Sequence, residues 1–420
     1  MVAQVTMLDD LRTIVGDKHA RPPDGSQRLA VDGMNPQAVV EPGSYEEVGA
    51  VMRYADEARL AVIPLGGGTQ RHTGNLPARY ELALSLSRLD QIIEHEPADL
   101  TVTCQSGISV QELQRRLRLN GQRVPFDLSP RQQASVGGVL ATNTNGPSRA
   151  ASGALRDFTI GMRVVTADGR ITRAGGKVVK NVAGYDLCKL YIGSLGTLGV
   201  IVEATFKVMP IAACERSVTL RVPGAWDACA LATELYRRGL ALSHVQLSST
   251  RNDRDNGWLL EIGLAGSDGA VERSENEIAS LAPGANARPA SAGGSATERF
   301  SSEDFDGSSL LCRFSVLPTR LAAFIGEVQR LETPDIVAAP ATGLVRAAWP
   351  EADEAMIVER GREIAASHSA TCVVELCSPE LKQRVDVFGE PPPAFELMHR
   401  VKQQFDPKGI LSPGRFVGRL

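Results

Sequence analysis

The chain has 420 residues, with 45 basic and 49 acidic side chains and a formal net charge of −4. This length is sufficient for two domains with separate hydrophobic cores. The balanced, interspersed charges lack the basic face that nucleic-acid binding requires. No apolar run approaches the ~20 residues that span a bilayer, and residues 1–17, with Asp9, Asp10 and Asp17, do not form a secretory signal. We therefore expect a cytoplasmic protein without a transmembrane segment.

The seven cysteines and six histidines are scattered along the chain. The closest cysteine pair, Cys372 and Cys377, has a separation that matches neither a zinc site nor an iron–sulfur site. An odd number of widely spaced cysteines also argues against a disulfide framework, so we interpret them as small buried residues in a reducing compartment. His72 is interpreted as a loop residue, and we expect no metal site.

The first predicted elements alternate between helix and strand. Ser44 and Glu47 form a capping box at the start of a helix with one apolar face. Strands are predicted over residues 61–65, 82–86 and 100–104, because apolar residues there form short runs or alternate with polar ones.

A second capping box, Ser109 with Glu112, begins a helix that ends at Asn120–Gly121. Asp168–Gly169 lies between two apolar segments and indicates a hairpin turn. Short helices mixed with many short strands predict an α+β fold rather than a regular βαβ series.

The pattern becomes looser after Pro210. It predicts a helix over residues 226–238 and a strand over 258–264. Residues 282–309 are rich in Ala, Ser, Gly and Pro, which predicts a long loop. A further helix is predicted over residues 395–405, ahead of the tail Asp406–Gly414.

Two glycine-rich loops carry the strongest functional signal. Gly66–Gly68 follow the predicted strand 61–65, and glycine there allows positive φ and lets successive N–H groups form an anion-binding nest. Gly137–Gly138 provide a second place where the backbone can approach a ligand. Two such loops could bind a ligand that has a diphosphate and a flat ring. FAD has both of these groups. A Walker A loop ends in Gly-Lys-Ser/Thr, whereas Gly68 is followed by Thr69, and a Rossmann fingerprint requires glycine where this chain has Arg71.

Several segments in chain order resemble the FAD-linked oxidases of the vanillyl-alcohol oxidase superfamily. The resemblance covers about residues 39–210 and the C-terminal tail. These segments are Pro64–Gln70, Gln105–Ser109, Ala134–Asn143 with Gly146, Arg156–Asp157, Val164–Gly169, Lys180–Leu187, Gly193–Ile201 and Phe405–Gly414. Within the superfamily, Lys180–Leu187, Gly146–Arg149 and the short second domain look most like the FAD-binding E subunits of bacterial glycolate oxidases.

This resemblance implies an α+β fold with a PCMH-type FAD-binding domain of two subdomains and a smaller α+β cap domain. The implied boundaries are an N-terminal extension over 1–38, the FAD-binding domain over 39–210, the cap or substrate domain over 211–380, and a C-terminal segment over 381–420 that returns to the FAD-binding domain.

The resemblance also implies a set of cofactor-binding positions. Thr69 stands where some members attach FAD covalently to histidine, so we expect non-covalent FAD. Val200 and Ile201 also fit a plain strand core. The implied positions are Leu65, Gly66, Gly67, Gly68, Thr69, Gln70, Ser135, Val136, Gly137, Gly138, Ala141, Thr142, Asn143, Arg149, Asp157, Gly199, Val200 and Ile201.

Removing a hydride from a 2-hydroxy acid requires a cation for the carboxylate and a base for the hydroxyl proton. The histidine motifs that larger relatives use for this chemistry do not occur here. The remaining catalytic candidates are Arg346 and Arg131, as cations near a substrate pocket, and Lys180, near the flavin ring.

The resemblance implies an FAD-dependent oxidoreductase subunit that oxidises glycolate or another small 2-hydroxy acid. It would take a hydride itself or relay electrons, beside a larger FAD-binding subunit and an iron–sulfur subunit that connect it to the inner membrane. Two alternatives remain open: a non-catalytic scaffold subunit with the FAD fold, and a self-sufficient FAD-dependent sugar or alcohol oxidase. Thr69 argues against the latter, because such oxidases often carry covalent FAD.

Overall fold

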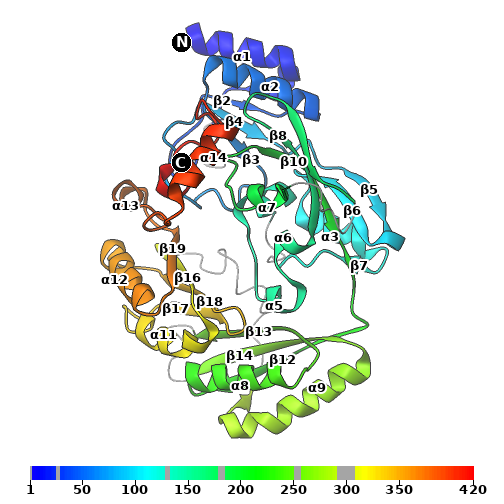
Figure 1. The fold of residues 1–420 in the computed structure, drawn as a ribbon, viewed down its shortest axis with the longest axis vertical. Helices are drawn as coiled ribbons and strands as arrows, with labels where there is room; N and C mark the ends of the chain where they lie inside the picture. The colour runs from blue at the N-terminus through cyan, green and yellow to red at the C-terminus, as the bar shows by residue number, and fades with distance from the viewer. Residues whose placement is uncertain (1, 25–28, 128–132, 178–184, 250–256, 291–307) are drawn as a thin grey trace.

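The computed structural model describes residues 2–24, 29–127, 133–177, 185–249, 257–290 and 308–420. The chain forms two parts, one around the N- and C-terminal segments and one around the middle of the sequence (Figure 1). The first part contains two main sheets, and the second contains one large sheet. This mixture of helices and sheets confirms the predicted α+β class.

The first sheet has the strand order β1-β2-β4-β3, and β2 and β3 both run parallel to β4. Helices α1 and α2 pack against it through a shared apolar core. The element bounds are α1 (Val2–Val15), β1 (Ala20–Arg21), β2 (Ala38–Val40), α2 (Tyr45–Ala58), β3 (Val62–Leu65) and β4 (Leu82–Ser85). At the start of α2, Ser44 Oγ accepts the N–H of Glu47 at 3.1 Å, as predicted. The Glu47 carboxylate accepts the N–H of Gly43, one residue earlier than a capping box requires.

The second sheet is antiparallel, with the order β5-β6-β10-β8-β9. Helices α3, α4, α6 and α7 contribute to the apolar core on one of its faces. The bounds are β5 (Ile92–Glu96), β6 (Thr101–Gln105), α3 (Val110–Arg118), β7 (Gln122–Arg123), α4 (Val136–Thr142), α5 (Arg149–Ser152), α6 (Leu155–Phe158), β8 (Thr159–Val165), β9 (Ile171–Gly175), α7 (Cys188–Tyr191), β10 (Val200–Lys207) and β11 (Met209–Pro210). The predicted hairpin turn joins β8 to β9, with Gly169 at φ +80°.

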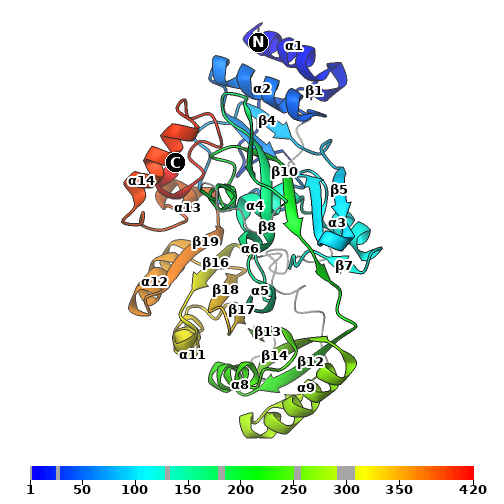
Figure 2. The same cartoon turned by 45° about the vertical axis from the view of Figure 1, so that its right-hand side comes forward.

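The third sheet, called the cap sheet here, has eight antiparallel strands in the order β15-β12-β14-β13-β17-β18-β16-β19. Helices α8, α9, α11 and α12 cover its outer face (Figure 2). The bounds are β12 (Cys214–Val222), α8 (Ala225–Arg237), β13 (Leu242–Ser249), β14 (Trp258–Gly266), α9 (Asp268–Leu281), β15 (Arg288–Pro289), β16 (Leu310–Ser315), α11 (Leu321–Val328), β17 (Asp335–Ala339), β18 (Leu344–Trp349), α12 (Glu354–Ser367) and β19 (Thr371–Leu376). The inner face is turned toward the first part, and α5 contacts β13 there.

The predicted loop over residues 282–309 is wrong in its first part. Ala282–Ala285 form a 3-10 turn, and β15 pairs with the edge strand β12. Ala282 and Ala287 are buried in the cap core, so the apolar residues of this small-residue stretch are used for packing. Residues 291–307 lie outside the described part of the chain.

The C-terminal segment packs against the first part. It contains α13 (Pro379–Arg384) and α14 (Phe395–Phe405), the helix predicted from the sequence. Beyond α14 the chain lies beside β3: Ile410 O accepts the N–H of Val62 at 2.7 Å, and Ser412 N donates to Val62 O at 2.9 Å. The C-terminal tail therefore lies beside the strand that leads into the glycine loop.

A buried lysine fixes this tail. Lys402 Nζ donates to Asp406 Oδ2 at 2.6 Å, to Thr197 O at 2.8 Å and to Leu411 O at 2.9 Å. Asp406 also accepts the backbone N–H groups of Ile410 and Leu411. This network connects α14, the tail and the loop that precedes β10.

Replacing Lys402 with methionine should lower the free energy of unfolding by about 3–5 kcal/mol, because Asp406 would be left as a buried charge without its cation. Lys408→Met is the matched control, since its ion pair with Asp56 is more exposed to solvent than the Lys402–Asp406 pair and should contribute less than about 1 kcal/mol. Urea denaturation of both variants measures the difference. Equal effects from the two substitutions would contradict the predicted role of Lys402.

Candidate functional site

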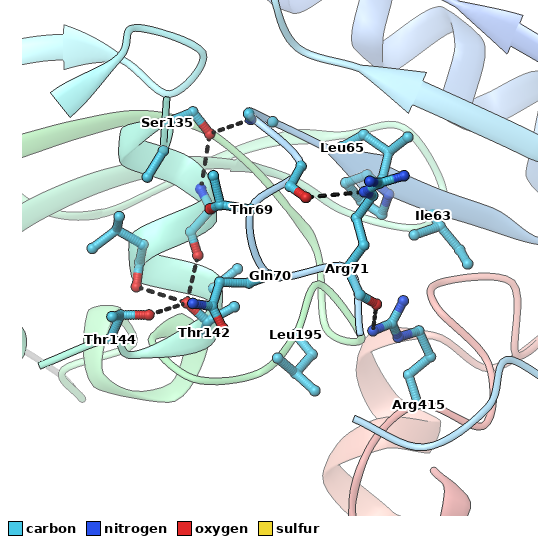
Figure 3. A pocket seen from close by; sticks show the side chains of 18 residues that line it. Ile63, Leu65, Thr69, Gln70, Arg71, Ser135, Thr142, Thr144, Leu195 and Arg415 are labelled. Carbon is cyan, nitrogen blue, oxygen red and sulfur yellow. Dashed lines mark hydrogen bonds between the residues drawn. The ribbon is translucent and has the colours of Figure 1, made fainter. Parts of the chain in front are cut away.

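The two glycine-rich loops are in direct contact. After β3, the chain turns through Gly66–Gly68 toward the start of α4 (Figure 3). A Cβ atom on Gly66 would lie 1.9 Å from Ser135 Oγ, and one on Gly67 would lie 1.8 Å from Gln133 O. Gly68 has φ +75°, which disfavours any other residue. Glycine at these positions therefore allows the two loops to pack backbone to backbone.

Ser135 connects the loops by hydrogen bonds. Its Oγ accepts the N–H of Gly138 at 3.2 Å, as the N-cap of α4, and the N–H of Gly67 at 3.3 Å. At the other end of α4, Thr142 Oγ1 is bonded to Gly138 O at 2.9 Å and to Thr144 Oγ1 at 2.7 Å. These contacts hold the loop and the short helix as one unit (Figure 3).

A cleft opens along this unit. It contains about 700 Å³ of empty space, including the part open to solvent. Its lining consists of Ile63, Pro64, Leu65, Gly66, Gly67, Gly68, Thr69, Gln70, Arg71, Ala134, Ser135, Gly138, Val139, Ala141, Thr142, Thr144, Leu195 and Arg415. Arg415 comes from the C-terminal tail, so three distant parts of the sequence meet here.

A second cavity, with about 890 Å³ of empty space including the part open to solvent, lies between the first part and the cap sheet. It shares Gln70, Thr142, Thr144 and Leu195 with the first cleft, so the two spaces adjoin. The cap sheet contributes charged side chains of β16, β18 and β19, and the first part contributes Asn143, Asn145 and Arg149. A ligand in the first cleft and a second molecule in this cavity would therefore be neighbours.

Two arginines share one carboxylate on the cap side of this cavity. Glu375 accepts Arg313 Nε at 2.7 Å and Arg346 Nε at 2.8 Å. Burial alone would raise the pKa of Glu375, but the charges and hydrogen bonds of Arg346 and Arg313 outweigh it, so this pKa lies below its ordinary value. The carboxylate is therefore ionised at neutral pH, and the cluster of Arg313, Arg346 and Glu375 has one excess positive charge.

The lowered pKa of Glu375 predicts acid-dependent stability. A carboxylate whose pKa is lower in the folded chain stabilises it fully above the unfolded value of about 4.5 and loses this contribution as the pH falls through the folded value. Urea denaturation from pH 7 down to pH 3 should show a loss of stability in this acid window that Glu375→Gln lacks. A variant with an unchanged pH profile would contradict the assignment.

Ten of the positions that the resemblance implied for the cofactor line the first cleft: Leu65, Gly66, Gly67, Gly68, Thr69, Gln70, Ser135, Gly138, Ala141 and Thr142. Three others line the second cavity: Asn143, Arg149 and the catalytic candidate Arg346. Arg131 and Lys180 lie outside the described residues.

The remaining implied positions line neither space. Val136 and Gly137 are buried on the far side of α4, where a Cβ on Gly137 would lie 2.9 Å from Ser106 Cβ. Asp157 accepts the N–H of Ala154 at 2.7 Å at the start of α6. The last three, Gly199, Val200 and Ile201, lie at the start of β10, where Val200 and Ile201 are buried in apolar cores.

Sequence reasoning missed four residues that line these spaces. Arg71 Nε donates to Gly68 O at 2.9 Å and thus braces the glycine loop. Arg415 follows directly after the C-terminal segment that carried the resemblance. Its position next to that segment was the one sequence signal that could have pointed to it. Arg313 and Glu375 stand on the same face of their strands as Arg346, but only the strand register of the cap sheet brings the three together.

A glycine-rich loop after a strand, packed against the start of a helix and lining a cleft, is the arrangement that a ligand with a diphosphate requires. Residues 36–175 match the family described as "FAD binding domain", and residues 389–416 match "FAD linked oxidases, C-terminal domain". The chain thus carries an FAD-binding domain and a C-terminal segment of the FAD-linked oxidase type. Its cofactor is FAD.

Curated relatives match part of the chain. D-2-hydroxyglutarate dehydrogenase of Xanthomonas citri pv. viticola is 40% identical over 174 residues, covering 41% of this chain and 37% of that protein. Glycolate oxidase subunit GlcD of Bacillus subtilis is 37% identical over 175 residues, covering 42% and 37%. D-lactate dehydrogenase of Archaeoglobus fulgidus is 32% identical over 205 residues, covering 49% and 46%. The matched region thus spans less than half the length of these relatives.

Solved structures share the whole fold. p-Cresol methylhydroxylase with bound substrate gives a TM-score of 0.75 at 17% identity, covering 99% of this chain and 97% of that one. The 4-ethylphenol oxidase of Gulosibacter chungangensis gives 0.75 at 16% identity, with the same coverage. At this identity the likeness concerns the fold, which confirms the predicted PCMH-type architecture.

The residues of the cleft fit FAD. The glycine loop leaves no room for side chains and exposes backbone to the cleft, as a diphosphate requires. Arg415 contributes a buried cation to the lining. Within the described residues, no group of histidine, cysteine and acidic side chains is arranged to hold a metal ion. No helix in that part of the chain has the length and apolar character needed to cross a membrane.

Proposed function

We propose that the chain is an FAD-dependent oxidoreductase that acts on a small 2-hydroxy acid. The observation that carries this proposal is the excess positive charge of Arg313, Arg346 and Glu375 beside the FAD cleft. A carboxylate substrate is attracted to such a cluster and can be held by charge-assisted hydrogen bonds. The names of the relatives support this class, because each refers to a 2-hydroxy acid.

In this proposal, the protein positions the acid for loss of a hydride from the carbon that bears its hydroxyl group. FAD, when bound by Gly66–Gly68 and the start of α4, supplies the acceptor for that hydride. Arg346 and Arg313 bind the substrate carboxylate, and Glu375 orients both guanidinium groups. Arg149 adds a cation on the opposite wall, with no ion pair to any described residue. The inner face of the cap sheet limits the access of water.

Glu375 is unsuited to be the base that takes the hydroxyl proton. Its pKa is lowered and its oxygens already accept hydrogen bonds from two arginines. The described lining of the second cavity contains no histidine. This composition supports the finer proposal that the chain is a subunit of a glycolate oxidase complex, with part of the chemistry on another chain.

In that complex, the chain would resemble the FAD-binding E subunit and work in the cytoplasm with non-covalent FAD. Its partners would be a larger FAD-binding subunit and an iron–sulfur subunit, to which it would relay electrons. The sequence resemblance over Lys180–Leu187 and Gly146–Arg149 and the similarity to subunit GlcD support this arrangement.

An anaerobic absorption spectrum of the isolated chain tests the proposal. Glycolate, D-lactate and D-2-hydroxyglutarate are added separately, first to the chain alone and then to the chain with its candidate partner subunits. Bleaching of the flavin bands by a 2-hydroxy acid in either preparation is the expected result. Flavin that stays oxidised in both preparations, but is reduced by a sugar or a simple alcohol, would overturn the choice of substrate class.

A further inference from the structure

Arg415 is a buried cation that forms no ion pair with any carboxylate of the described residues. Its side chain and backbone are only 5% exposed, and burial lowers its pKa below the ordinary value. One terminal nitrogen, Nη2, donates to Arg71 O at 2.8 Å and to Thr73 O. Its Nε makes no hydrogen bond, and no carboxylate of the described residues forms an ion pair with it. A buried guanidinium in this state is costly unless an anion joins it.

The backbone of Arg415 packs against the turn at Gly74 and Asn75, which follows the glycine loop in the sequence. Arg415 O accepts the N–H of Asn75 at 3.0 Å, and a Cβ on Gly74 would lie 2.6 Å from the same oxygen. Gly74 has φ +95°, so another residue would also strain the turn. The main chain at Arg415 is therefore fixed, and its side chain starts from a defined position beside the cleft.

The cleft that Arg415 lines is the one formed by Gly66–Gly68 (Figure 3). Its ligand, FAD, carries a diphosphate with negative charge, which would neutralise the guanidinium. Backbone nests bind anions through partial charges, and a full positive charge on a buried side chain strengthens that attraction. Asp32 is the acidic side chain whose charge acts on the pKa of Arg415, but it already forms an ion pair with Lys382 at 2.8 Å.

We propose that Arg415 is a cofactor-binding residue, whose positive charge is neutralised by the diphosphate of the dinucleotide. The C-terminal tail thereby contributes directly to the affinity for FAD, and dinucleotide binding relieves an unfavourable charge in the empty protein. This inference concerns the cofactor and holds whichever substrate the protein oxidises.

Titrations of the apoprotein with FAD and with ADP test the proposal. FAD binding is followed by quenching of flavin fluorescence, and ADP, which carries a diphosphate without flavin, by calorimetry. Arg415→Gln should weaken both ligands by the same factor, about 10- to 100-fold, as expected for the loss of a hydrogen bond to a charged group. Arg415→Lys should retain most of the affinity. Arg400→Gln, which removes an exposed cation from the same segment, should leave both affinities unchanged.

Salt dependence and apoprotein stability separate a charge effect from a structural one. FAD affinity of the unaltered protein should fall as ionic strength rises, and Arg415→Gln should flatten this dependence. The melting temperature of the apoprotein should change little, since the cost of the unpaired charge is removed together with its hydrogen bonds. The proposal is overturned if ADP affinity is unchanged in Arg415→Gln, or if Arg415→Lys and Arg415→Gln lose FAD equally while both apoproteins melt at lower temperature.

Discussion

Gly67→Ala should yield a protein that purifies without FAD. The added Cβ atom would lie 1.8 Å from Gln133 O and 3.2 Å from Ala134 Cα, and both are backbone atoms. No rotation of a side chain can relieve this contact, so the glycine loop must move away from the start of α4. Moving it breaks the hydrogen bond from Gly67 N to Ser135 Oγ and separates the two walls of the cleft.

We expect the FAD dissociation constant of Gly67→Ala to rise at least about 100-fold, because a backbone shift of this kind costs roughly 3 kcal/mol. Fluorescence titration measures the constant, and circular dichroism checks that the chain is folded. Gly269→Ala is the matched control, since a Cβ on this residue of α9 meets nothing within 4 Å. Normal FAD affinity in a folded Gly67→Ala protein would show that the diphosphate does not bind at this loop.

The sequence allowed prediction of features that depend on neighbouring residues. Ser44 and Ser109 each cap a helix, and Gly169 allows the turn between two strands, as expected from local backbone chemistry. The glycine loop after β3 was predicted because an anion nest requires only a few successive residues. The α+β fold followed from the same short elements and from the resemblance.

The parts of the site that depend on long-range packing could not be predicted from local pattern. Arg415 lies far along the chain from Arg71, and only the placement of the tail beside β3 brings them together. Glu375 reaches Arg313 and Arg346 through the register of β16 with β18 and β19. Val200 and Ile201 fitted both a cofactor site and a strand core, and burial on β10 places them in the core.

Arg346 is brought to Glu375 by the strand register of the cap sheet, and replacing it is the most informative test of the second cavity. Its Nε donates to Glu375 at 2.8 Å, and its side chain is 7% exposed, against 32% for that of Arg313. Arg313 can therefore remain beside the carboxylate when Arg346 is replaced. The excess positive charge disappears in Arg346→Gln, because one arginine then balances one carboxylate.

We expect Arg346→Gln to lower the rate of flavin reduction by the 2-hydroxy acid, measured as kcat/KM in the preparation that is active, by about 100-fold, corresponding to ~3 kcal/mol for a charge-assisted contact. FAD affinity should not change, because Arg346 lines only the second cavity. Arg330→Gln, an exposed cation of the cap domain, should behave like the unaltered protein. A folded, FAD-loaded Arg346→Gln protein with full activity would show that the carboxylate binds elsewhere. A loss of FAD would instead indicate that the cap sheet supports the cofactor cleft, since the two cavities adjoin.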